Sequence, residues 1–384
     1  MTKSKKTIAL MLAAAVLLLV SCSNKPADKG ETPANADKTE VYKLGLDTWD
    51  SGTPLFDGYG DEAQHTAETA GMEVLRVSDE ADTGKQYANI ARLIAEGADA
   101  LMFQGGAEQA VPQLAAAAKD AKKPFLLYTL VGDDKDREKF AETNSYYVGA
   151  FDEDAYRDGK LMGQAALSDG AKMALVIGGA VGSSTMDLKA SGFSEAFRAG
   201  GGIILDEVRC TDVSECVTKT DDAISANEEV DTLYIMSGDY VAGVMSSLAR
   251  KGMTGKFTLY MSGVDKASAE LILQGVIKRG NDGVVLAAAI APTLLLNYLD
   301  GHQILDKNGK PPHFQTVPFE VNQKNADEYL AVFYAAGLHP ITDRVLRSLC
   351  FRYNTSVSYE TYSELIENSL NLLALMDAGG IKGN

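Results

Sequence analysis

A regular alternation of short apolar runs with segments of helical periodicity constrains the fold of this chain more than any other feature. The alternation begins with Val41–Leu46, a predicted strand, and continues with Tyr59, Ala63, Ala67 and Ala70, which recur at helical spacing. Strands that alternate with helices along a chain are joined by crossover connections and therefore lie parallel. The pattern predicts a parallel sheet that is covered by helices on both faces.

The same rhythm restarts at Tyr146–Phe151 and runs through a second series of similar length. Two series of this size predict an α/β fold with two doubly wound parallel-sheet lobes in place of one very large sheet. Ligands of such sheets bind at loops beyond the carboxyl ends of the strands, so the expected site is the cleft between the lobes. The strands of the second series are expected at residues 172–177, 202–208, 232–236, 256–261 and 283–290.

The N-terminus has the composition of a secretion signal. Three lysines precede the apolar run Ile8–Val20, which is 13 residues long, whereas a membrane-spanning helix needs about 20. The run ends just before Cys22, in a sequence that resembles the bacterial lipobox, where a cysteine thiol accepts a diacylglyceryl group. We expect residues 1–21 to be a lipoprotein signal peptide and Cys22 to be lipidated. An ordinary signal peptide with an accidental cysteine is the alternative.

Residues 23–40 contain no aromatic and no large aliphatic side chain. Such a segment cannot bury enough apolar surface to offset the entropy of ordering it, so residues 22–40 are expected to form a flexible tether. No second long apolar run follows. We therefore expect the protein to belong to the cell envelope, to face the periplasm or the cell exterior, and to reach the membrane only through its lipid anchor.

The net charge of −17 at pH 7 argues against several classes of partner. A field of this sign repels phosphate backbones and anionic lipid head groups, so no nucleic acid ligand is expected. Zinc is not expected either, because the four histidines are scattered and none stands at ligand spacing to a cysteine. No phosphate-binding glycine motif and no nucleophile signature occurs, so neither a cofactor nor enzymatic activity is expected.

Cys210 and Cys216 stand six residues apart, and an oxidising exterior favours a disulfide that closes a small loop between them. Two unpaired thiols are the alternative. Cys350 would then be left without a partner and is expected to be buried in a helix.

Several short motifs, taken in their order and spacing, resemble those of the type I periplasmic binding proteins, most closely the ribose- and galactose-type sugar receptors of ABC transporters. The resemblance covers roughly residues 41–330. Its motifs are Thr53-Pro54-Leu55-Phe56, the segment Asn89–Leu101, Gly182-Ser183-Ser184-Thr185 leading to Ser191-Gly192-Phe193, Ser237-Gly238-Asp239, and Gly263-Val264-Asp265.

The resemblance implies two lobes that are each discontinuous in sequence. The chain would cross between them near Ala150, Ile290 and Val317, and these three strands would form a hinge that closes around a ligand. Residues 334–384 are expected to form a C-terminal helical extension. The expected lobe 1 comprises residues 41–150 and 291–317, and the expected lobe 2 comprises residues 151–290 and 318–333.

The loop beyond the first strand carries four candidate ligand-binding residues. Trp49, the only tryptophan of the chain, could stack on the apolar face of a sugar ring, and Phe56 matches an aromatic position of the family. Each could equally fill a hydrophobic gap. Asp50 and Thr53 in the same loop could bond ligand hydroxyls, or could cap the following helix.

Further polar candidates follow other predicted strands. Asp239 and Asp265 occupy positions where the family places polar ligand contacts, and one carboxylate can accept hydrogen bonds from two neighbouring hydroxyls. A solvated loop or a helix cap is the alternative for both residues. Gln104, after the third strand, either contacts the ligand or only lines the cleft.

Two departures from the family pattern argue against ribose itself as the ligand. Asp187 stands where sugar receptors often carry an arginine, and Tyr128-Thr129 replaces the Asp-Arg pair of ribose receptors. With Thr129 and Asp187 in the binding set, the expected lining is rich in acids and poor in arginines. Such a lining would tolerate a cationic or amino group on the ligand.

These expectations combine into a non-catalytic solute-binding protein of the cell envelope. It is expected to be a monomer that captures a sugar-like small molecule and delivers it to an ABC permease. A ligand-sensing subunit for a chemoreceptor or a sensor kinase is the alternative, because the same fold serves both tasks.

Overall fold

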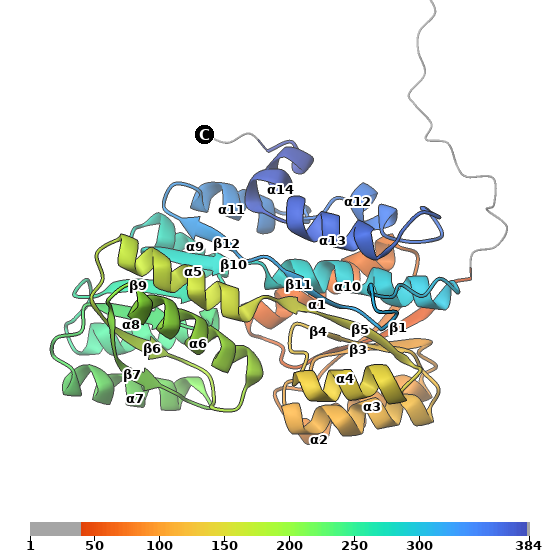
Figure 1. The fold of residues 1–384 in the computed structure, drawn as a ribbon, viewed down its shortest axis with the longest axis horizontal. Helices are drawn as coiled ribbons and strands as arrows, with labels where there is room; N and C mark the ends of the chain where they lie inside the picture. Colours follow the sequence, from red (N-terminus) through yellow and green to blue (C-terminus); the bar gives the residue numbers. More distant parts are fainter. Residues whose placement is uncertain (1–39, 382–384) are drawn as a thin grey trace, which may run out of the picture. The chain divides into compact units, whose positions relative to one another are not determined.

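The computed structural model describes residues 40–381 (Figure 1). The predicted signal peptide, Cys22 and almost all of the predicted tether lie outside these residues. None of the helices within residues 40–381 has the length and apolar character that spanning a membrane requires.

Two six-stranded sheets organise the described chain. In the first sheet the strands stand in the order β11-β5-β4-β3-β1-β2, and all neighbours are parallel. We call this sheet and its helices the first lobe. Its strands are β1 (Lys43–Thr48), β2 (Glu73–Ser78), β3 (Ala100–Phe103), β4 (Phe125–Tyr128), β5 (Tyr147–Glu153) and β11 (His313–Thr316), and its helices are α1 (Pro54–Thr69), α2 (Thr83–Ala95), α3 (Val111–Asp120), α4 (Asp134–Thr143) and α10 (Val284–Leu299).

The second sheet has the order β12-β10-β9-β8-β6-β7 and is parallel except for the pair of β10 with β12. This sheet and its helices form the second lobe. Its strands are β6 (Met173–Ile177), β7 (Ile203–Val208), β8 (Thr232–Ile235), β9 (Thr258–Ser262), β10 (Arg279–Asp282) and β12 (Phe319–Asn322), and its helices are α5 (Ala155–Ser168), α6 (Ser184–Ala199), α7 (Val213–Ala226), α8 (Val241–Arg250) and α9 (Lys266–Leu273).

The chain passes between the two sheets three times. It leaves the first sheet after β5, returns where β10 is followed by α10, and leaves again between β11 and β12. Four helices follow in the C-terminal part: α11 (Ala326–Phe333), α12 (Asp343–Ser348), α13 (Tyr359–Asn368) and α14 (Leu372–Gly379). The predicted fold class, two doubly wound lobes with a C-terminal helical extension, is confirmed (Figure 1). Of the three strands expected to cross between the lobes, the second is replaced by a connection from the strand β10 to the helix α10.

The expectation of a strand at residues 283–290 is wrong. This segment opens α10, which packs against β3, β4, β5 and β11, and the strand that precedes it is β10. The sequence Val284–Leu299 is apolar on all sides because the helix is buried on all sides, so it shows no helical periodicity. The predicted crossing near Ile290 therefore falls inside a helix, and the chain crosses at Gly283 instead.

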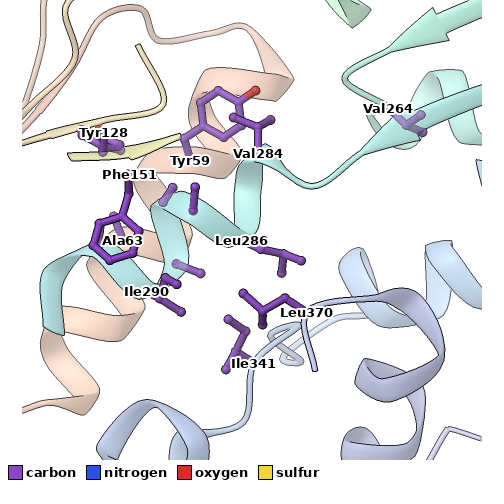
Figure 2. Close-up of a cluster of buried hydrophobic side chains, with 14 of the residues drawn as sticks. Tyr59, Ala63, Tyr128, Phe151, Val264, Val284, Leu286, Ile290, Ile341 and Leu370 are labelled. Atoms are coloured by element: carbon purple, nitrogen blue, oxygen red, sulfur yellow. The ribbon is translucent and has the colours of Figure 1, made fainter. Parts of the chain in front are cut away.

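The buried helix α10 is the centre of the largest hydrophobic cluster. Ile290 of α10 lies close to Phe151 of β5, while Leu286 faces Ile341 and Leu370 of the C-terminal part (Figure 2). Asn297 at the end of the same helix donates to the Leu349 carbonyl at 2.8 Å. The C-terminal helices are thus packed onto the first lobe as part of its core.

The C-terminal part also contacts the second lobe. Helix α12 packs on α1 and α13 packs on β11, both in the first lobe, whereas α14 packs on α11, which in turn packs on α9 and β12 of the second lobe. Figure 1 shows these helices side by side above α10 and α9. The extension therefore contacts elements of both lobes.

Candidate functional site

Two neighbouring cavities lie where the lobes face each other. The larger has a volume of about 680 Å³ and is lined by residues 131–135 and Arg137 of the first lobe and by Ser184, Thr185, Asp187 and Leu188 of the second, together with Asp152 and Tyr156. The smaller, about 250 Å³, lies between residues 105–109 and residues 180–185. Both cavities include Gly132 and Ser184 in their walls. Ligand-sized space is therefore bounded by loops of both sheets.

The lobes touch each other directly beside these cavities. The backbone N–H of Ser184, at the start of α6, donates to Glu108 Oε1 at 2.5 Å. The Ser184 hydroxyl donates to the Gly132 carbonyl at 3.4 Å. A helix N-terminus favours a negative charge, so the Glu108 carboxylate is well placed to hold α6 against the first lobe.

Three predicted residues of the first lobe form one hydrogen-bonded chain. The backbone N–H of Trp49 donates to Gln104 Oε1 at 2.6 Å, and Gln104 Nε2 donates to Thr129 Oγ1 at 2.5 Å. The half-buried Trp49 ring lies flat against Gly106, where a Cβ atom would meet the indole at 1.9 Å. Only glycine at position 106 permits this contact. Gln104 is fully buried and serves to position Trp49.

Thr53 and Phe56 lie at the start of α1. Thr53 precedes the helix but makes no capping hydrogen bond, and its buried hydroxyl oxygen has no partner among the described residues. Phe56 packs edge-on against Tyr59, with ring centroids 5.6 Å apart. Part of the Phe56 surface is buried in the core, as expected if this side chain fills a hydrophobic gap.

Three predicted carboxylates on different loops interact electrostatically. Burial raises the pKa of Asp239, and the negative charges of Asp265 and Asp50 raise it further. Asp50 belongs to the first lobe, whereas the other two follow β8 and β9 of the second. Asp265 accepts hydrogen bonds from the Ser268 N–H at 2.7 Å and from the Ser268 hydroxyl at 2.5 Å. It therefore caps α9, as its alternative interpretation expected.

Asp187 stands apart from the other predicted carboxylates and lines the larger cavity. Its Oδ1 lies 2.5 Å from the Arg209 guanidinium, which also donates to the carbonyls of Gly179 and Ala180. Arg209 thus neutralises Asp187 and supports the loop before α6. Sequence reasoning missed this arginine because it follows β7, far from Asp187 along the chain.

A buried charged group at the connection between the lobes was also missed. Lys189 of α6 lies 2.6 Å from Glu153 Oε1 at the end of β5 and 3.1 Å from Asp158 Oδ2 of α5. Burial raises the pKa of Glu153 to about 7, although Lys189 opposes the shift. Nearby, burial raises the pKa of Asp282 to about 6, and the Tyr329 hydroxyl donates to this carboxylate at 2.6 Å. No apolar periodicity signals such a cluster in the sequence.

The cysteines are arranged in two environments. Cys210 and Cys216 are joined as a disulfide, and Cys350 is a buried free thiol just beyond α12. Within residues 40–381, no group of histidine, cysteine and carboxylate side chains is arranged to hold a metal ion.

Comparison with known proteins assigns the family. The sequence model of the periplasmic binding protein domain matches residues 45–303, which is more than half of the chain. The chain belongs to this family. Its predicted resemblance to type I periplasmic binding proteins of the ribose and galactose type is confirmed, and the C-terminal helices lie beyond the matched range.

Individual relatives of the family are distant in sequence. The ribose import binding protein of Bacillus subtilis is 20% identical over 248 residues, which are 65% of this chain and 78% of that protein. A solute-binding protein from Actinobacillus succinogenes, solved with bound D-allose, has a TM-score of 0.66 at 17% identity and covers 75% of this chain and 100% of its own. A Bacillus halodurans protein with bound myo-inositol has a TM-score of 0.65 at 14% identity, with 77% and 99% covered.

Proposed function

We propose that this protein is an extracytoplasmic solute-binding protein that captures a sugar or sugar-like molecule between its lobes. The observation that carries the proposal is the pair of cavities whose walls come from loops of both sheets. A molecule held there would contact both lobes at once. Such a molecule would favour the arrangement in which those loops face each other, because only that arrangement offers all of the contacts.

Side chains on the loops of both lobes suit a polyhydroxylated ligand, although Asp187 alone of the predicted residues lines one of the two cavities. Trp49 offers an indole, Thr53 a hydroxyl oxygen without a partner among the described residues, and Asp239 a carboxylate with a raised pKa that accepts from the Ser237 hydroxyl at 3.1 Å. Apolar ring faces and directional acceptors are what a sugar ring requires. The family relatives solved with D-allose and with myo-inositol support the same ligand class. We keep Asp50, Phe56, Gln104, Thr129, Asp187 and Asp265 in the proposed ligand-binding region.

We further propose that Cys22 carries a lipid anchor and that the loaded protein delivers its ligand to an ABC permease without any chemical step. The proposed hinge consists of the three connections after β5, after β10 and between β11 and β12. Closure around the ligand would present a permease with a surface that the empty protein lacks. The division into lobes expected from the sequence remains part of this proposal, with its second crossing moved to Gly283.

Ligand-dependent stabilisation tests the proposal. The domain that begins at residue 41 should be screened by thermal unfolding against D-allose, D-ribose, D-galactose, myo-inositol and the matching amino sugars. A ligand at 100 times its dissociation constant should stabilise the fold by about 2.7 kcal/mol. Because Arg209 neutralises Asp187, a neutral sugar should stabilise the protein at least as well as its amino counterpart. Absence of stabilisation by every sugar and polyol, with amino acids or nucleosides active instead, would reject the ligand class.

A further inference from the structure

Two carboxyl groups are buried side by side beneath the Trp49 loop. Asp47 belongs to β1 and Asp79 directly follows β2, and neither side chain is exposed to solvent. The strands β1 and β2 are parallel neighbours that pair Asp47 with Val77, and the N–H of Asp79 donates to the Thr48 carbonyl at 3.0 Å. The register of the sheet therefore brings the two acids together at its carboxyl edge.

Each carboxyl group has one oxygen bonded to an amide and one oxygen that faces no donor. Asp47 Oδ2 accepts from Gln86 Nε2 at 2.8 Å, and Asp79 Oδ1 accepts from Asn89 Nδ2 at 2.9 Å. Asp47 Oδ1 and Asp79 Oδ2 have no donor among the described residues, and each of the two side chains acts on the pKa of the other. Two ionised carboxylates cannot hydrogen-bond, because both are acceptors only.

Among residues 40–381, no ion pair joins a cation to either acid. The basic residues nearest to Asp79 in the sequence are engaged elsewhere, since Arg76 pairs with Asp61 and Lys85 pairs with Glu80. The other titratable groups that act on the pair are Asp82, which disfavours a second negative charge, and Tyr128, whose hydroxyl donates to the Asp47 carbonyl at 2.9 Å. Burial, followed by the charge of Asp79, raises the pKa of Asp47 well above its ordinary value.

The pair is linked to Trp49 by two routes. Gln86 Nε2 donates to Asp47 and also to the Gln104 carbonyl, at 2.7 Å from the latter. The Gln104 side chain in turn accepts a hydrogen bond from the backbone N–H of Trp49. On the other side, the Trp49 carbonyl accepts the N–H of Ala81 at 2.8 Å, two residues beyond Asp79. Separation of the two carboxyl groups would therefore pull on both bonds that hold the backbone of Trp49.

We propose that Asp47 and Asp79 share one proton at neutral pH, and that this proton-bridged pair positions Trp49 at the cleft. Both acids are then positioning residues that act on the ligand through Trp49, a role that rests on the proposed function. Loss of the shared proton leaves two adjacent buried negative charges, which repel each other and release the loop. The pair itself exists whatever the ligand is.

Infrared spectroscopy of the full chain without ligand tests the shared proton directly. The wild-type protein should show a protonated carboxyl band near neutral pH, where exposed carboxyls are ionised. This band should lose intensity in Asp47→Asn and in Asp79→Asn. Asp99→Asn is the matched control, because Asp99 accepts the N–H of Lys43 at 2.9 Å at the opposite end of β1. A wild-type spectrum without any protonated carboxyl, or a band that neither substitution reduces, overturns the proposal.

Fluorescence of the only tryptophan tests the positioning role without any ligand. Raising the pH beyond the range in which ordinary carboxyls titrate should shift the emission of Trp49 to longer wavelength as the pair loses its proton. Asp79→Asn should abolish this shift, since an amide can donate to Asp47 without ionising. Asp99→Asn should retain it. A shift that persists in the double variant Asp47→Asn/Asp79→Asn contradicts the positioning role, and failure of sugar binding alone leaves both spectroscopic results intact.

Discussion

At the scale of single residues, the structure gives two of the candidates different surroundings. Trp49 is half-buried on Gly106 beyond the carboxyl end of β1, and its backbone is hydrogen-bonded to Gln104 and Ala81. Asp265 caps α9 through Ser268. Substitution of Trp49 should therefore affect ligand affinity, whereas substitution of Asp265 should affect the unfolding free energy.

Trp49→Ala should weaken ligand binding by about 1–3 kcal/mol, because a large ring loses its burial against the ligand. Trp49→Phe should recover part of the affinity, since a smaller ring can still stack. Calorimetric titration with the sugar that stabilises the protein best measures both variants. If truncation lowers only the melting temperature and leaves affinity unchanged, the ring only fills space.

Asp265→Ala should lower the unfolding free energy by about 0.5–2 kcal/mol, the usual effect of removing a helix cap. Asp265→Asn should retain most of the stability, because the amide oxygen can still accept the N–H of Ser268. Urea unfolding followed by circular dichroism gives both values. Equal losses for alanine and asparagine would show that the charge, and not the cap, is what the fold needs.

At the scale of elements, most strands could be predicted because their apolar runs are short and bounded by turns. The strand β10 could not, since its sequence Arg279-Gly280-Asn281-Asp282 has no apolar side chain although it is largely buried. It is a strand because β9 and β12 pair with it on either side. The helix α10 was mistaken for a strand for the opposite reason, because its continuous apolar sequence fits a buried strand equally well.

The candidate site likewise contains residues that could be proposed from the sequence and contacts that could not. Candidates on loops that follow strands, such as Trp49 and Asp239, could be proposed from the sequence because parallel strands place their carboxyl ends at one edge. The pairings of Arg209 with Asp187 and of Lys189 with Glu153 join residues from separate elements. They depend on how helices and strands pack, which no spacing along the chain encodes.

The junction between α10 and the C-terminal extension gives a prediction for an element. Asn297 donates to the Leu349 carbonyl and to the Tyr362 hydroxyl, and it accepts the N–H of Phe351 at 2.6 Å. Asn297→Ala should lower the unfolding free energy by about 1–3 kcal/mol for the buried groups left without a partner. Denaturant unfolding should show this loss, whereas the exposed Asn368→Ala should change little. Equal effects of the two substitutions would mean that the junction is not structural.

At the scale of the whole molecule, buried acids give the stability a characteristic pH dependence. Burial raises the pKa of Glu153 to about 7 and that of Asp282 to about 6, whereas unfolded carboxyls titrate near 4. In the pH range between the unfolded and the folded pKa values of these acids, the folded protein therefore binds more protons than the unfolded chain. Stability must then fall as the pH rises through this window, by about 1.4 kcal/mol per pH unit for each extra proton bound.

Urea unfolding at about pH 5 and about pH 8 should show the higher stability at the lower pH. Glu153→Gln should flatten the dependence, because the amide cannot lose a proton and Asp158 still pairs with Lys189. Below the ordinary carboxyl range the trend should reverse, since Arg279 lowers the pKa of Asp169. A stability that rises steadily toward about pH 8 would contradict the assignment of these acids as protonated in the fold.

Under the proposed hinge closure, the C-terminal extension should affect how strongly a ligand is held, although it lies outside the two cavities between the lobes. Its helices contact α1 and β11 of one lobe and, through α11, the α9 side of the other. Contacts that span two moving bodies lower the free energy of the arrangement in which they are made, and raise its population before any ligand arrives. An apparent dissociation constant equals the intrinsic constant divided by the fraction of molecules already competent to bind. Helices that make no contact with the ligand can therefore tighten its binding, because less of the binding free energy is then needed to close the lobes.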